Sequence, residues 1–284
     1  MGLLRSALRP AAEKVVTAVA ARVAVRNHID DVGSELLYGP AGRLNDRTLT
    51  RAQLDLLAAQ VRDTTGVADA VPHVAQAYRM LVGLEGRCVG RIAGTTSNIL
   101  GKLVAAPLLL PARSRPVRVL EIGTLFGVFA AGFHQQLLRY GHAHDLVIVD
   151  PLETVQLQPE RERATDPSGT PVTLGTLLVN LRFGGVDLDR VRVERGLSSD
   201  PSVRSAVGDF FDLVIIDGDH SLAGVAADLA WAERIAAPGA VVVMDDYGDP
   251  GWPGVQQALD AHLAGETRFS LRGVVSTSAF LVAG

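Results

Sequence analysis

Two acidic clusters contain the residues of this chain best suited to chemistry: residues 217–220 (DGDH) and 245–247 (DDY). Each directly follows a short apolar run, 211–216 (FDLVII) or 240–244 (AVVVM), of the β-branched kind that forms buried parallel strands. Carboxylates that follow neighbouring strands repel one another unless a cation or a shared proton compensates. A divalent ion is the simplest compensation, so the sequence predicts a metal site at one edge of a sheet.

Residues 221–236, between the two runs, have the apolar spacing of a helix, which Pro238 and Gly239 are expected to end. A strand, a helix and a second strand in this order form a right-handed crossover, which places both strand carboxyl ends on one side. Ligands of open α/β sheets bind outside those ends. The acidic clusters are therefore expected to lie in the ligand site.

Strands and helices alternate throughout the second half of the chain. Further strands are expected at 117–122, 146–149 and 191–194, and two more in the tail, 269–275 and 279–283, joined at 276–278. The pattern predicts an α/β fold with a doubly wound, mostly parallel sheet, to which a closing hairpin adds an antiparallel edge strand.

The first half of the chain is predicted to be mostly helical, with a polar break at 38–45 and a capping-type start at 48–50. The segment 111–116 (PARSRP) separates this half from the sheet. We therefore expect a helical N-terminal region, 1–110, that serves as a cap, an oligomerisation element or an acceptor cover, and a second domain, 111–284.

The composition argues against several classes of protein. With 27 basic and 31 acidic residues, the net charge of −4 argues against a nucleic-acid binder. Cys88 is the single cysteine, so no internal disulfide forms and a reducing cytoplasm is the expected compartment. No window reaches the roughly 18 apolar residues that a transmembrane segment needs. The basic first 27 residues predict an amphipathic helix that packs on its own domain or on a sister subunit, as in a homodimer, rather than on a membrane.

The turn after the first predicted strand, 121–127 (EIGTLFG), indicates a nucleoside site. Gly123 permits a sharp bend and Gly127 permits close packing of the following helix. A dinucleotide fingerprint would need glycine at Leu125, so a pyrophosphate cradle is not expected. Asp150, at the end of the second strand, can accept both ribose hydroxyls, and Glu121 can face a cationic or amine-bearing ligand. A helix cap or a surface ion pair is the alternative for either acid.

Together with a G-x-S sequence at 196–198, these motifs resemble the class I S-adenosylmethionine-dependent methyltransferases. The carboxylate pattern resembles their metal-dependent O-methyltransferases, of the catechol and caffeoyl-CoA types and more closely the macrocin and novobiocin-type sugar enzymes; the cephalosporin hydroxylase-like branch shares it. The resemblance covers roughly residues 113–284 and implies a seven-stranded Rossmann-like domain that binds S-adenosylmethionine.

The resemblance also implies roles for individual residues. The cofactor would be bound by the turn, by the ends of the second and third strands and by the first acid of DGDH. These residues are Glu121, Gly123, Thr124, Gly127, Asp150, Ser198 and Asp217. Asp217, Asp245 and Asp246 match the positions that bind Mg²⁺ or another divalent cation. Asn98, Gly101 and Lys102, just before the first strand, would lie where related enzymes cover the methyl donor.

The proton acceptor is left open between two residues. Catechol-type enzymes have a lysine base where this chain has His220, whereas the sugar-modifying branch uses the preceding acid, here Asp219, which we favour slightly. Asp219 alternatively caps the following helix, His220 alternatively packs or contacts the cofactor, and Asp245 with Asp246 alternatively forms a solvated turn.

The expected function is transfer of a methyl group to a hydroxyl of a small molecule, a sugar or a polyketide-type natural product, with the metal lowering the hydroxyl pKa. Two alternatives stay open: a binding protein with the same fold and no turnover, and a nicotinamide-dependent oxidoreductase, which Leu125 disfavours.

Overall fold

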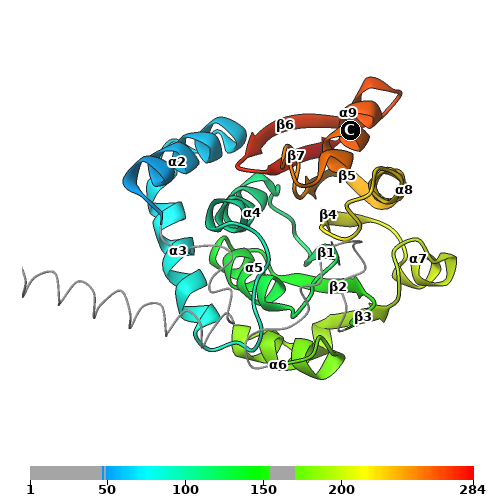
Figure 1. Ribbon diagram of the computed structural model, residues 1–284, viewed down its shortest axis with the longest axis horizontal. Helices are drawn as coiled ribbons and strands as arrows, with labels where there is room; N and C mark the ends of the chain where they lie inside the picture. Colours follow the sequence, from blue (N-terminus) through cyan, green and yellow to red (C-terminus); the bar gives the residue numbers. More distant parts are fainter. Residues whose placement is uncertain (1–46, 48, 154–169) are drawn as a thin grey trace, which may run out of the picture. The chain divides into compact units, whose positions relative to one another are not determined.

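The computed structural model describes residues 47, 49–153 and 170–284. The polar break, the predicted basic N-terminal helix and most of the loop at 152–172 lie outside the described residues. Within the described residues, the helices that precede the sheet are α2 (Arg51–Thr65), α3 (Val71–Glu85) and α4 (Thr96–Leu109) (Figure 1). The predicted capping start is confirmed, because Thr50 and Gln53 form a capping box at the beginning of α2.

Seven strands form one sheet in the order β3-β2-β1-β4-β5-β7-β6, so the fold class predicted from the sequence is confirmed. Strands β1 to β5 are parallel to their neighbours, and β7 is antiparallel to β5 and β6. The strands are β1 (Val117–Ile122), β2 (His144–Asp150), β3 (Val191–Arg195), β4 (Phe211–Ile216), β5 (Ala236–Met244), β6 (Phe269–Val275) and β7 (Ser278–Ala283).

Helices cover both faces of the sheet, with α4 and α5 on one side of it and α8 and α9 on the other (Figure 1). Successive strand residues point to opposite faces, so Val241 and Val243 pack with α2 to α6, whereas Val242 and Met244 pack with α7 to α9. These helices are α5 (Val128–Arg139), α6 (Leu174–Gly184), α7 (Pro201–Val207), α8 (Leu222–Ile235) and α9 (Pro253–Ala264), with a short 3₁₀ turn η1 (Leu188–Arg190).

Two expectations need correction. The closing hairpin does not simply add one edge strand, because β7 is inserted between β5 and β6. Helix α8 ends at Ile235, within one residue of the expected end, but β5 begins at Ala236 rather than at Ala240, so Pro238 and Gly239 lie inside a strand and do not end the helix. The register between β4 and β5 shifts at this point. Such an irregularity accommodates a proline without a missing ladder hydrogen bond, which local sequence rules do not reveal.

Helix α4 is the element that connects the N-terminal helices to the sheet. Its N-cap is Thr95, whose hydroxyl accepts a hydrogen bond from the Asn98 amide. The helix packs against α2, α3 and α5 and against strands β5, β6 and β7, and residues 98–107 are all buried. Its polar side chains Asn98 and Lys102 therefore project into the interior of the protein rather than into solvent. Among the described residues, no helix is long and apolar enough to cross a membrane.

A pair of imidazoles lies between α5 and β2. His134 Nδ1 is 3.1 Å from His144 Nε2, and the His144 ring also bonds the carbonyl of His142. Burial lowers the pKa of His144, and burial together with the neighbouring His144 lowers the pKa of His134 to about 4. Both rings are therefore neutral in the folded protein at neutral pH.

We expect this pair to make stability sensitive to mild acid. The unfolded chain binds protons at these rings below a pKa of about 6.5, whereas folded His134 stays neutral down to about 4. Between these values the unfolded state binds more protons, so the free energy of unfolding falls as the pH falls. His134→Gln should flatten this dependence between pH 6.5 and 4, measured by urea unfolding. Equal slopes for the two proteins would contradict the assignment.

Candidate active site

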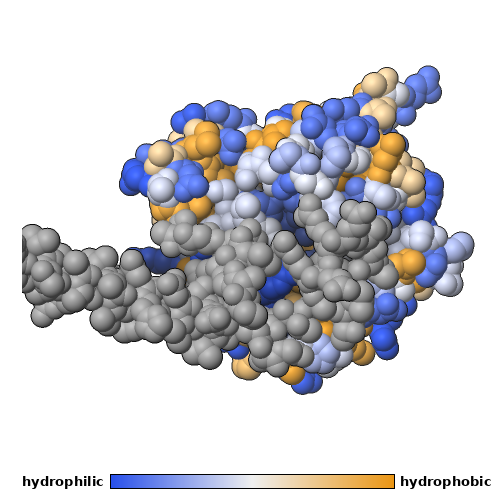
Figure 2. Space-filling view, in the orientation of Figure 1, coloured by the Kyte–Doolittle hydropathy of each residue, from blue (hydrophilic) through white to orange (hydrophobic). Residues whose placement is uncertain are grey.

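A cavity of about 720 Å³ lies at the carboxyl ends of the parallel strands. Its wall includes the turn after β1, the end of β2, the loop after β3 and both acidic clusters, with Lys102 of α4 behind them. Hydrophilic side chains (blue) occupy the recess near the centre of the visible face in Figure 2. The volume is that of a typical small-molecule or cofactor site.

The turn after β1 requires glycine at Gly123. This residue has a φ of 84°, and a Cβ there would lie under 3.0 Å from the carbonyl oxygen of Asp217. The turn thus passes directly against the end of β4. Gly127, with a φ of 75°, begins α5 and faces Leu177 of α6 at similarly close range.

Asp150 lies at the end of β2 and holds this turn in place. One carboxylate oxygen accepts hydrogen bonds from the amides of Thr124 (2.7 Å) and Leu125 (3.1 Å), and the other accepts from Leu152 (2.7 Å). Each carboxylate oxygen can accept more than one hydrogen bond. The observed role of Asp150 is therefore structural, and its predicted binding of ribose hydroxyls stays a prediction.

Glu121 is buried beside the turn, with its side-chain Oε2 lacking a hydrogen-bond partner among the described residues. Burial is the main reason that its pKa is raised to about 8, and the charges of Asp217 and Asp150 raise it further. A buried carboxyl group in the wall of the cavity is suited to pair with an amine.

Ser198, predicted to lie near the adenine, faces an acid that sequence reasoning missed. Its hydroxyl donates to Asp228 of α8 at 3.0 Å, and Arg204 approaches the other oxygen of Asp228 at 3.5 Å. Burial raises the pKa of Asp228 to about 6. The sequence does contain an indication of this acid, because Asp228 lies with Val225 and Leu229 on the apolar face of the predicted helix.

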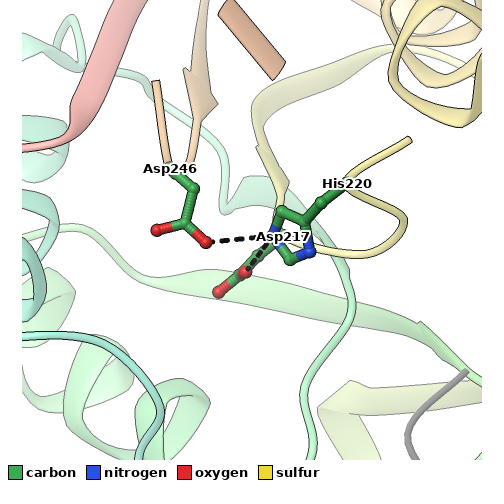
Figure 3. Close-up of side chains that lie close together, drawn as sticks. All are labelled: Asp217, His220 and Asp246. Atoms are coloured by element: carbon green, nitrogen blue, oxygen red, sulfur yellow. Dashed lines mark ion pairs between the residues drawn. The ribbon is translucent and has the colours of Figure 1, made fainter. Parts of the chain in front are cut away.

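The acidic clusters meet at the ends of β4 and β5 (Figure 3). His220 Nε2 lies 3.1 Å from Asp246 and 3.7 Å from Asp217, and its ring stacks on Trp252 at 4.6 Å between centroids. Burial alone would lower the pKa of His220, but the two carboxylates raise it to about 10. Ligand atoms of Asp217, His220 and Asp246 lie within 4.8 Å of one another, close enough to share a metal ion.

Asp245, the third predicted metal ligand, is bonded to other side chains and is not part of the group formed by Asp217, His220 and Asp246. Its Oδ1 accepts hydrogen bonds from Asn98 (2.6 Å) and Ser278 (2.9 Å), and its Oδ2 forms an ion pair with Lys102. Burial and the charge of Asp217 raise the pKa of Asp245. The sequence resemblance implied only that Asn98 and Lys102 cover the donor, because local patterns do not show that α4 packs against these acids.

Asp219 is turned toward the start of α8. One of its oxygens accepts from the Ser221 amide at 2.8 Å and the other from the Ser221 hydroxyl at 3.0 Å. Ser221 is itself the N-cap of the helix. Asp219 lines the cavity, but both its oxygens already have partners.

The sheet has one antiparallel strand inserted next to the last, and the cavity lies at the ends of β1 and β4, where ligands of open α/β sheets bind. Residues 120–247 match a family model described as a methyltransferase domain. The recognition made from the sequence is confirmed at this level. A search of curated proteins gave no match.

Several solved structures resemble this chain in fold. The O-methyltransferase from Bacillus cereus in complex with SAH is 17% identical (81% of this chain, 100% of that chain, TM-score 0.45). The O-methyltransferase NovP is 15% identical (82% and 96%, TM-score 0.46). The SAH-bound Podospora anserina methyltransferase PaMTH1 is 16% identical (83% and 97%, TM-score 0.46).

The close approach of the turn to β4 predicts a large effect of Gly123→Ala. The added methyl group would displace the turn from Asp217, so we expect S-adenosylhomocysteine affinity, measured by calorimetry, to fall by about tenfold or more. Gly141→Ala is the matched control, because Gly141 also has a positive φ (80°) but open space around it. Equal losses of affinity in the two variants would show that the close approach is unimportant.

Proposed function

We propose that this protein is an S-adenosylmethionine-dependent O-methyltransferase that acts on a hydroxyl group of a small molecule. The observation that supports this most directly is the single cavity that joins the Gly123 turn to the Asp217, His220 and Asp246 cluster. The first part suits a nucleoside that lacks phosphates, and the second suits an acceptor hydroxyl. The two parts lie on the adjacent strands β1 and β4.

Methyl transfer requires that the acceptor oxygen is aligned with the methyl group and that this oxygen loses its proton. The methyl group of a sulfonium is already activated, so holding the acceptor oxygen in line with it can supply several kcal/mol of the barrier reduction. Glu121 and Asp150 would orient the donor, and the acid and histidine cluster would receive the acceptor. Ser198 with Asp228 would face the adenine.

Of the two predicted proton acceptors, His220 is better placed than Asp219. His220 is supported by Asp246 on one side and by Trp252 on the other, whereas both Asp219 oxygens are engaged by Ser221. With its pKa raised to about 10, His220 is protonated at neutral pH in the free protein. It can accept a proton only if the positive charge of a bound sulfonium donor lowers that pKa.

The predicted divalent cation fits this arrangement only in part. Asp217, His220 and Asp246 lie close enough to share an ion, but both oxygens of Asp245 are engaged by other residues. Mg²⁺ prefers oxygen ligands, but the pairing of Asp245 with Lys102 leaves only two of the three expected aspartates, together with His220, to share an ion. Mg²⁺ dependence stays a prediction, and no step of the proposed reaction is assigned to the ion.

The acceptor class is proposed from the sequence resemblance, and the cavity is large enough for a small molecule. Sugars and polyketide-type natural products carry neighbouring hydroxyls that the acidic cluster would bind, and Trp252 would flank them. A helical cap formed by residues 1–110, a homo-oligomer and a cytoplasmic location belong to the same proposal.

The cofactor assignment is tested by binding. S-adenosylhomocysteine should bind with a dissociation constant in the micromolar range (~8 kcal/mol), and NADH should not bind. Asp150→Asn should weaken S-adenosylhomocysteine by about tenfold or more, because the turn amides lose a charged acceptor. Tight NADH binding would favour the oxidoreductase instead.

The choice of proton acceptor is tested by turnover. With an acceptor identified from a panel of sugars and phenols, His220→Gln should lower kcat by about 10²-fold or more. Asp219→Asn should change kcat by less than about tenfold, since it keeps an oxygen for Ser221. The reverse order of effects would assign the proton to Asp219. Cofactor binding without transfer to any acceptor would favour the non-catalytic alternative.

A further inference from the structure

Lys102 places a positive charge among the carboxylates where the sequence predicts a metal ion. Its side chain is 2% exposed, and its Nζ forms an ion pair with Asp245 and lies 3.4 Å from Asp217. It also lies 4.9 Å from the centre of the Phe129 ring. The ammonium group thus bridges two of the three acids that were expected to share a divalent cation.

Both oxygens of Asp245 are engaged by neighbouring side chains. Its Oδ2 is paired with Lys102, and its Oδ1 already accepts from Asn98 and Ser278, so displacing Lys102 would break a buried ion pair. The ammonium group of Lys102 would then stay buried without its closest carboxylate partner, which is unfavourable. An incoming ion would have to offset this cost.

Lysine rather than arginine suits this position. The chain has 27 basic residues, of which only Lys14 and Lys102 are lysines. An ammonium group is a compact point charge with three donors, whereas a guanidinium is a wide planar fork. The compact group fits between two carboxylates, as a metal ion does.

We infer that Lys102 is a built-in counter-ion that replaces the divalent cation at the ends of β4 and β5, so that the site works without a bound metal. The inference deepens the proposed function, because it concerns the same site. Asp217 and Asp245 then share the single positive charge of Lys102, and Asp246 is paired with His220. The acceptor hydroxyl is bound by hydrogen bonds to this cluster and not by chelation.

The test measures Mn²⁺ binding to the full-length protein by electron paramagnetic resonance, with Mn²⁺ alone as the probe. We expect the wild type to bind Mn²⁺ with a dissociation constant no tighter than about 1 mM (~4 kcal/mol). Lys102→Met removes the charge and frees an oxygen of Asp245, so it should bind Mn²⁺ at least tenfold more tightly. Micromolar binding by the wild type, or no gain in the variant, would overturn the inference.

Arg115→Met is the matched control, because Arg115 neutralises the buried Asp212 at the opposite end of β4. It should leave Mn²⁺ affinity unchanged, and a gain equal to that of Lys102→Met would also overturn the inference. If Lys102→Met does not fold, the wild-type affinity alone decides. S-adenosylhomocysteine binding is measured in parallel with EDTA present: its absence counts against the proposed function, whereas the Mn²⁺ result bears on the counter-ion alone.

Discussion

Carboxylates buried at the ends of neighbouring strands need a cation buried with them, and this constraint organises the rest of the structure. Asp245 is almost fully buried, and Lys102 reaches it from α4. Because α4 must run beneath the strand ends to deliver the ammonium group, the helices before the sheet become part of the site. The charge of the acidic cluster and the packing of α4 are thus linked, because Lys102 reaches Asp245 only from this helix position.

The two ends of the cavity are built by different means. Backbone groups form the end near β1, where Asp150 holds the amides of Thr124 and Leu125 and the turn touches the end of β4. Charged side chains form the end near β5, where His220 lies against Asp246. A rigid backbone suits a ligand that is always the same, whereas side chains can be changed to suit different acceptors.

Local patterns were enough to predict the strands and the position of the edge at which the cavity lies. The runs at 117–122 and 211–216 correspond to β1 and β4 residue for residue, because buried parallel strands are continuous and apolar. The partners of the acids were not predictable, since Lys102 and Asp245 are 143 residues apart. The bulge around Pro238 and the insertion of β7 also depend on pairing between distant segments, which a single sequence does not display.

Helix α4 also limits how this protein can be recombined with its relatives. A chimaera that joined residues 111–284 to the first half of another chain would set Asp245 beside whatever side chain that half supplies at position 102. Only a half with a cation there would leave the strand ends compensated. The two halves of the chain are therefore expected to function only together, although a proline-rich segment separates them in the sequence.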